Sequence, residues 1–136
     1  MISLILVSHC RDIAQGVLQL AVEMTQTPVS IVAVGGIPDG EGGYRIGTDA
    51  LSIRDAIEAN WNSDGVLLLV DLGSAVLSAE TAIEFLPEEM QPVCLISNAP
   101  LVEGAVIAAL EASLQHSLQD VNRAAEAVRC LDKVTR

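Results

Sequence analysis

Residues 65–74 have the sequence GVLLLVDLGS, an aliphatic run that ends in a carboxylate, a glycine and a serine. Consecutive aliphatic residues bounded in this way indicate a strand buried on both faces, which is typical of parallel sheets. Further runs rich in aliphatic residues occupy residues 2–7, 29–34 and 93–96. The sequence therefore predicts about four buried strands.

Helical patterns occupy the segments between and after these runs. Apolar spacing, prolines and polar caps predict helices over about residues 12–24, 49–60, 74–85, 103–114 and 118–131. In the first two helices, the residues expected on the buried face are Ile13, Val17, Leu20, Met24, Leu51, Ile53 and Ile57. Alternating strands and helices predict an α/β fold, namely a doubly wound, mainly parallel sheet with helices on both faces.

Composition and charge exclude several classes of function. The chain has 136 residues, which suits one domain over residues 1–136, and a formal net charge of −11. Such a surface repels nucleic-acid phosphates and anionic lipids, so we expect no nucleic acid and no membrane as a partner. The three cysteines form no CxxC pair, which is typical of reduced thiols in a cytoplasmic protein.

The segment from Gly35 to Gly47 holds six of the ten glycines, together with Pro38 and Asp39. This composition predicts a long mobile loop, and loops of that length often carry function. The glycines match neither the Walker A motif nor a GxGxxG between a strand and a helix, so neither motif supports nucleotide binding.

Ligands of open parallel sheets bind beyond the carboxyl ends of the strands. The polar and glycine residues expected there are Ser8, His9, Cys10, Gly35, Gly36, Asp71, Gly73, Ser74, Ser97 and Asn98. His9 is the candidate nucleophile, because a neutral imidazole attacks phosphorus near pH 7 and releases the phosphoryl group readily. If the first and third strands are neighbours, Asp71 lies beside His9 and fixes its tautomer. Backbone N–H groups of Gly73 and Ser74, at a helix start, would meet the phosphoryl oxygens.

Other interpretations of these residues have less support. His9 could simply end a strand, and Cys10 could simply fill space, since a phosphatase loop built on Cys10 would need arginine where Gly16 stands. Asp71 could be the phosphorylated residue of a receiver domain, but acidic residues are missing after the first strand. Two histidines and dispersed cysteines lack metal-ligand spacing, so we expect no metal and no cofactor.

Four motifs together resemble a known family. They are Val7-Ser8-His9, Gly47-Thr48-Asp49-Ala50, Asp71-Leu72-Gly73-Ser74-Ala75 with Ser78-Ala79-Glu80, and Ala99-Pro100-Leu101-Val102-Glu103-Gly104. In this order and spacing, over Met1 to about Ala112, they resemble the phosphotransfer subunits of bacterial dihydroxyacetone kinases. These subunits belong to the mannose-type enzyme IIA group of the phosphoenolpyruvate phosphotransferase system.

The resemblance implies a phosphotransferase cycle. His9 would accept a phosphoryl group from the histidine phosphocarrier protein and pass it to ADP on the nucleotide-binding kinase subunit. Asp71 would orient His9, while Ser8, Thr48, Gly73 and Ser74 would bind the phosphoryl group; these four residues are the expected phosphoryl site. The resemblance also implies a homodimer.

Two alternatives stay open. An enzyme IIA that feeds a mannose-type sugar transporter would use the same chemistry with another acceptor. A regulatory module that senses a phosphorylated ligand without turnover would need no transfer, although such a sensor would gain more from arginine or lysine than from a histidine beside a carboxylate.

Overall fold

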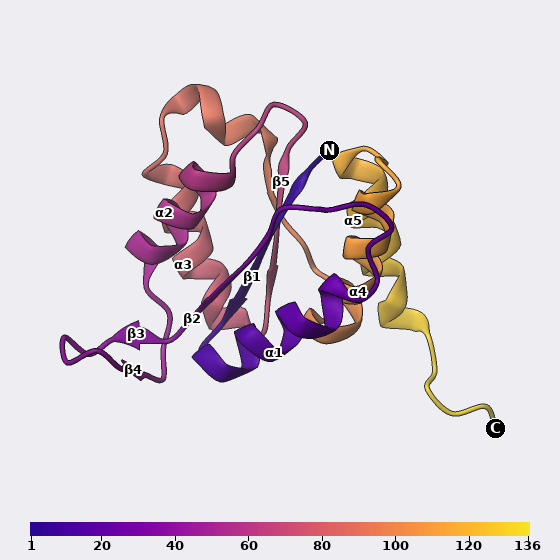
Figure 1. Ribbon diagram of the computed structural model, residues 1–136, viewed down its shortest axis with the longest axis horizontal. Helices are drawn as coiled ribbons and strands as arrows, with labels where there is room; N and C mark the ends of the chain where they lie inside the picture. The colour runs from indigo at the N-terminus through magenta and orange to yellow at the C-terminus, as the bar shows by residue number, and fades with distance from the viewer.

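Four parallel strands form the central sheet, and their order in space differs from their order in the chain (Figure 1). In the computed structural model, which describes residues 1–136, the order is β2 (Ile31–Gly35), β1 (Ser3–Ser8), β5 (Val66–Val70) and β6 (Cys94–Ile96). The chain winds from β1 to β2 and then crosses to β5 on the other side of β1. The winding therefore reverses between β1 and β5, which is where open α/β sheets bind ligands.

Five helices cover the two faces of the sheet (Figure 1). One face packs against α1 (Arg11–Val22), α4 (Leu101–Ser113) and α5 (Leu118–Ala127), and the other against α2 (Ala50–Asn60) and α3 (Gly73–Glu84). Two 3-10 helices, η1 (Glu88–Val93) and η2 (Val128–Cys130), follow α3 and α5. The predicted doubly wound α/β fold is confirmed. None of the helices combines the length and the apolar character needed to cross a membrane.

The core has one half on each face of the sheet. Side chains alternate along β1, so Leu4 and Leu6 pack on the α1, α4 and α5 side while Ile5 and Val7 pack on the α2 and α3 side. All four are fully buried, and burying each such side chain contributes about 1.5–3 kcal/mol. This double burial explains why the strands are continuous aliphatic runs.

The buried helix faces differ in part from the prediction. In α1 the buried residues are Ala14, Val17 and Ala21. Ile53 and Ile57 of α2 are fully buried, as predicted. Four residues predicted to be buried are instead at least 38% exposed, namely Ile13, Leu20, Met24 and Leu51. In and after α1 the prediction was wrong because Ala14 and Ala21 face the sheet, which leaves larger side chains at the edge of the contact. In α2, Leu51 lies off the face that carries Ile53 and Ile57.

The glycine-rich segment was predicted as a long mobile loop, but it contains a short β-hairpin, so the assignment of the whole segment to a loop was wrong. Strands β3 (Ile37–Pro38) and β4 (Tyr44–Arg45) pair antiparallel and project beside the start of α1 (Figure 1). In the turn, the Asp39 carboxylate accepts hydrogen bonds from the N–H groups of Glu41 and Gly43 at 2.7 and 3.0 Å. Side chain to backbone bonds of this kind give the turn a defined shape.

Both ends of this segment lie against the residues that follow β1. At the first end, a Cβ on Gly35 would lie 2.8 Å from the Cα of Arg11 and from the carbonyl oxygen of Cys10. Only glycine therefore lets β2 end so close to the start of α1. At the other end, the Gly47 N–H donates to the His9 carbonyl at 2.8 Å. The hairpin is thus attached to the backbone of the candidate nucleophile.

Candidate functional site

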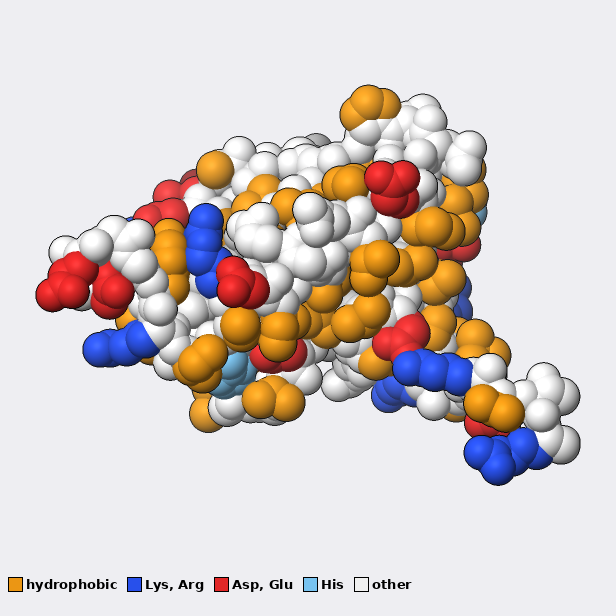
Figure 2. Space-filling view, turned by 60° about the horizontal axis from the view of Figure 1, so that its bottom comes forward, with side chains coloured by type: hydrophobic (Ala, Val, Ile, Leu, Met, Phe, Trp, Pro, Cys, Tyr) orange, Lys and Arg blue, Asp and Glu red, His pale blue; other side chains and the backbone are white.

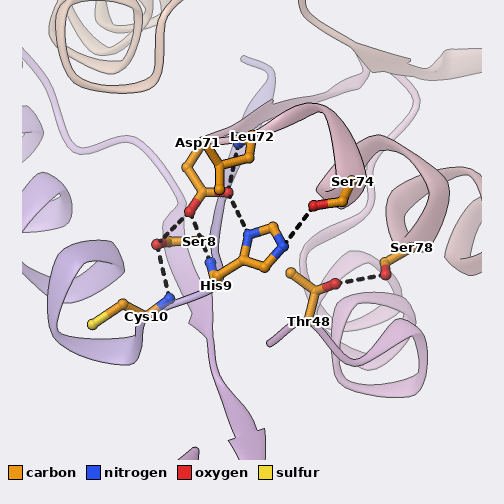
Figure 3. Close-up of polar contacts among 8 residues, drawn as sticks. All are labelled: Ser8, His9, Cys10, Thr48, Asp71, Leu72, Ser74 and Ser78. Atoms are coloured by element: carbon orange, nitrogen blue, oxygen red, sulfur yellow. Dashed lines mark hydrogen bonds and ion pairs between the residues drawn. The ribbon is translucent and has the colours of Figure 1, made fainter. Parts of the chain in front are cut away.

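The carboxyl ends of β1 and β5 bring His9 and Asp71 together. The two strands are parallel neighbours, with Val7 opposite Val70, so the residues that follow them emerge at the same edge of the sheet. The Asp71 N–H donates to the Val7 carbonyl at 3.1 Å and so extends this pairing by one residue. The predicted position of Asp71 beside His9 is confirmed (Figure 3).

The Asp71 carboxylate accepts four hydrogen bonds. Oδ2 accepts from the His9 backbone N–H and from the Ser8 hydroxyl, each at 2.9 Å. Oδ1 accepts from the Leu72 N–H at 2.7 Å and from His9 Nδ1 at 3.0 Å. Burial acts to raise the pKa of Asp71, but the hydrogen bonds, led by the one from the His9 N–H, outweigh it and hold the pKa below its ordinary value. Asp71 is therefore an oriented anion at neutral pH.

This network fixes the tautomer of His9. A carboxylate can only accept a hydrogen bond, so Nδ1 carries the ring proton. The Nε2 atom then holds the lone pair, and it accepts a hydrogen bond from the Ser74 hydroxyl at 2.8 Å. The His9 side chain is 19% exposed. The free lone pair of the ring is thus on Nε2, and hydrogen bonds at both nitrogens hold the ring in place.

Three hydroxyl groups lie on the Nε2 side of the ring (Figure 3). Ser74 contacts Nε2 directly, and the Thr48 hydroxyl is 2.6 Å from the hydroxyl of Ser78. Each hydroxyl can rotate to donate to a new acceptor. The arrangement can therefore offer donors to a group that is bound to Nε2.

Ser78 was not predicted as a site residue. It follows Ser74 by four residues in α3, and residues at this spacing lie on one face of a helix. That spacing was a signal available in the sequence. Thr48, which was predicted from the family resemblance, lies close enough to Ser78 for their hydroxyl groups to pair.

The start of α3 adds backbone N–H groups to the site. The helix begins at Gly73, so its first N–H groups lie at the positive end of the helix dipole. A Cβ on Gly73 would meet nothing within 4 Å. The space beside Gly73 and Ser74 is therefore open, as a site for phosphoryl oxygens requires, and their binding role stays a prediction.

Ser8 occupies a different place from the one predicted. It is fully buried, and its hydroxyl donates to Asp71 and accepts the Cys10 N–H at 3.0 Å. A hydroxyl with both functions satisfied and no exposure cannot meet a phosphoryl group that arrives from solvent. Direct phosphoryl binding by Ser8 is therefore a wrong prediction, and the structure places Ser8 behind Asp71 as a support for the carboxylate.

Two clefts border the site. One of about 550 Å³ lies between the starts of α3 and α4 and includes Asp71, Gly73 and Arg129 in its lining. The other, of about 330 Å³, lies between the start of α1 and β4. No group of three or more His, Cys, Asp or Glu side chains is placed to hold a metal ion.

Fold and site together define an α/β domain that presents one aspartate-fixed histidine at the winding reversal of a parallel sheet. The model of the family described as "PTS system fructose IIA component" matches residues 3–122. The chain belongs to this family.

Curated relatives have more specific descriptions. The chain is 43% identical over 121 residues to "PEP-dependent dihydroxyacetone kinase 2, phosphoryl donor subunit DhaM" of Listeria innocua, covering 89% of this chain and 94% of the relative. It is 40% identical to the phosphoryl donor subunit DhaM of Escherichia coli K12, covering 83% of this chain and 24% of the relative. The subunit of Providencia stuartii is 38% identical, with coverage of 95% and 27%. The chain thus spans nearly all of the Listeria relative and about a quarter of the other two.

A solved structure has the same fold. The crystal structure of EF1359, described as a protein of unknown function, superposes with a TM-score of 0.79 at 33% sequence identity, covering 93% of each chain.

Proposed function

We propose that this chain carries a phosphoryl group on Nε2 of His9 and is the phosphoryl donor subunit of a phosphoenolpyruvate-dependent dihydroxyacetone kinase. The names of the relatives from Listeria, Escherichia and Providencia support the assignment. The observation that carries it is the His9 ring, whose Nδ1 is held by Asp71 while Nε2 stays available.

In the first step, the donor is the phosphorylated histidine phosphocarrier protein. The Nε2 lone pair attacks the phosphorus, so a P–N bond forms on His9 while the donor's P–N bond breaks and its electron pair returns to the donor. The His9 ring becomes cationic because Nδ1 keeps its proton. The anionic carboxylate of Asp71 stabilises this positive charge where it develops.

In the second step, an oxygen of the terminal phosphate of ADP, bound on the partner kinase subunit, attacks the same phosphorus. The P–N bond to His9 breaks, and its electron pair returns to Nε2 as the lone pair. ATP is the product, and His9 regains its starting tautomer without any proton exchange at Nδ1. Asp71 therefore keeps its hydrogen bond from His9 Nδ1 through the whole cycle.

Between the two steps, the groups on the Nε2 side hold the phosphoryl oxygens. The Ser74 hydroxyl, which donates to Nε2 in the free state, turns to a phosphoryl oxygen once Nε2 is occupied. The Thr48 and Ser78 hydroxyls and the N–H groups at the start of α3 supply further donors. We also propose a homodimer, which sedimentation of the purified chain tests.

Uptake of a phosphoryl group tests the carrier role. The chain is incubated with phosphoenolpyruvate, enzyme I and the phosphocarrier protein, and its intact mass is measured for wild type, His9→Ala and His116→Ala. His116 is the matched control, because it is the second of two histidines and lines a pocket with Met1 and Ile2, at the amino ends of the strands. We expect one acid-labile phosphoryl group on wild type and His116→Ala and none on His9→Ala. No uptake by wild type would contradict the carrier role.

The acceptor is tested separately. Phosphorylated chain is mixed with ADP and the nucleotide-binding subunit of a dihydroxyacetone kinase, and ATP is measured. We expect ATP to form in proportion to the loss of phosphohistidine. Transfer to a mannose-type transporter subunit instead of to ADP would contradict the kinase assignment while leaving the carrier role intact.

A further inference from the structure

Exposed apolar side chains surround the candidate nucleophile. Figure 2 shows hydrophobic side chains grouped beside histidine on one face of the molecule. Three residues next to the site in the chain are strongly exposed, with Ile46 at 70%, Leu72 at 60% and Leu77 at 67%. Ile46 precedes Gly47, Leu72 follows Asp71, and Leu77 precedes Ser78. Apolar exposure grouped in one place marks a surface that a protein partner covers.

The hairpin adds a cleft with two arginines to this surface. The 330 Å³ cleft is lined only by residues 10–12 and 44–46, which flank His9 and Gly47 in the chain. Arg11 stacks on the Tyr44 ring, with 4.3 Å between the guanidinium carbon and the ring centroid. Arg45 is exposed on β4. Asp12 is the acidic residue in the lining.

These two arginines are free to bind an anion. Four of the seven basic residues already pair with carboxylates, namely Arg54, Arg123, Arg129 and Lys133. Arg11 and Arg45 form no such pair. Hydrogen bonds from the Glu41 and Gly43 N–H groups hold the pKa of the Asp39 carboxyl below its ordinary value, and the charge of Arg45 adds a smaller contribution, but Arg45 and Asp39 form no ion pair. A planar guanidinium matches a carboxylate with two parallel hydrogen bonds.

The negative charge of the rest of the protein makes this cleft the favoured place for an acidic partner to bind. With a net charge of −11, the protein repels an acidic partner over most of its surface. Two unpaired cations beside His9 attract the same partner at one place, so the partner arrives with its reacting group facing Nε2. The hairpin keeps this position because Gly47 is bonded to the His9 carbonyl.

We propose that the start of α1 and the β3–β4 hairpin form a docking surface for an acidic protein face, with Asp or Glu side chains of the partner bound by Arg11 and Arg45 and its apolar residues resting on Ile46. The partner is a protein that exchanges the phosphoryl group with His9, so this inference rests on the proposed function. The apolar residues beside the cleft favour a protein face over a free phosphate compound.

A charge-reversal experiment tests the docking surface. Second-order rate constants are measured for transfer from the phosphocarrier protein and for transfer to the kinase subunit with ADP, at low and high salt. The variant is Arg11→Glu with Arg45→Glu, and the matched control is Arg54→Glu with Arg123→Glu, which changes the net charge equally. We expect the variant to lose about tenfold or more in at least one reaction at low salt, with the loss reduced at high salt. The control should stay within about threefold of wild type.

Two further readouts keep the result interpretable. Arg45→Glu alone is included because Arg45 is exposed and unpaired, so its replacement leaves the Arg11–Tyr44 stack in place. The hydrolysis rate of phosphohistidine without partners should be unchanged in every variant, because the His9 site is intact. Equal rates for variant and control in both reactions would overturn the docking surface alone. Failure of wild type to exchange with either protein would overturn the proposed function and the inference together.

Discussion

The two sides of the His9 ring are built differently. On the Nδ1 side, Asp71 is partly buried, accepts four hydrogen bonds and is supported by the fully buried Ser8. On the Nε2 side, Ser74, Thr48 and Ser78 present hydroxyls whose partners are each other or the ring itself. A carrier needs both properties, because one side must stay fixed while the other repeatedly changes its bonding partner.

The two sides of the ring should therefore respond differently to mutation. Removal of a group from the Nδ1 side leaves buried polar atoms without partners, so it should affect both stability and transfer. Removal of the exposed Ser74 hydroxyl from the Nε2 side leaves atoms that water can satisfy, so it should affect transfer alone.

Asp71→Asn should have the largest effect among these variants. An amide can donate to Nδ1 and so favour the tautomer with its proton on Nε2, and it carries no charge to stabilise the cationic ring. We expect the rate of phosphoryl uptake to fall on the order of 10²–10⁴-fold, the range typical of groups that fix a catalytic histidine. Asp55→Asn, at an exposed ion pair with Arg54, is the control. If Asp71→Asn took up the phosphoryl group at a rate within threefold of wild type, the Nδ1 side would not have the role assigned to it.

Ser74→Ala should reduce transfer on the order of tenfold, because one donor to the phosphoryl oxygens is lost while the neighbouring hydroxyls and N–H groups remain. The midpoint of thermal unfolding should stay close to that of wild type. Thr81→Ala, which removes a hydroxyl bonded to a backbone carbonyl farther along α3, is the control. A lower unfolding temperature without a change in transfer would reverse the roles assigned to the two sides.

Ser8→Ala should lower the free energy of unfolding by about 1–3 kcal/mol, because the Asp71 carboxylate and the Cys10 N–H both lose a buried partner. Urea unfolding followed by circular dichroism measures this change. An unchanged free energy of unfolding would show that the hydrogen bond from Ser8 to Asp71 does not stabilise the fold.

The pH dependence of stability should report the charge of Asp71. Its lowered pKa means that the folded state favours the ionised form, so the stabilisation is fully present above the unfolded-state value and is lost as pH falls through the folded-state pKa. The difference in unfolding free energy between wild type and Asp71→Asn should therefore be constant near neutral pH and shrink below about pH 4. A difference that grows on acidification would contradict the assigned direction.

Gly73→Ala should have the smallest effect. A Cβ at this position has open space around it, and the N–H groups at the start of α3 remain. We expect rates within about twofold of wild type, because alanine is well accepted in a helix. A large loss of transfer rate would show that the phosphoryl group lies against Gly73 and not only beside the hydroxyl groups on the Nε2 side.

The sequence predicted the sheet and the position of Asp71 beside His9, because buried parallel strands are continuous aliphatic runs and their carboxyl ends share one edge. It did not predict the hairpin, since glycine content indicates where a chain can turn but not which residues then pair. The buried alanines of α1 were missed because hydrophobic spacing favours large side chains. The place of Ser8 behind Asp71 depends on three-dimensional packing that spacing alone does not contain.

Identification of the phosphorylated nitrogen is the most direct test of the phosphoryl carrier role proposed for His9. Long-range ¹H–¹⁵N correlation spectra of the chain, labelled at histidine nitrogens and phosphorylated from phosphoenolpyruvate, distinguish a phosphoryl group on Nε2 from one on Nδ1. We expect phosphorylation of His9 at Nε2, with Nδ1 still protonated and bonded to Asp71. Phosphorylation at Nδ1, or on a residue other than His9, would contradict it.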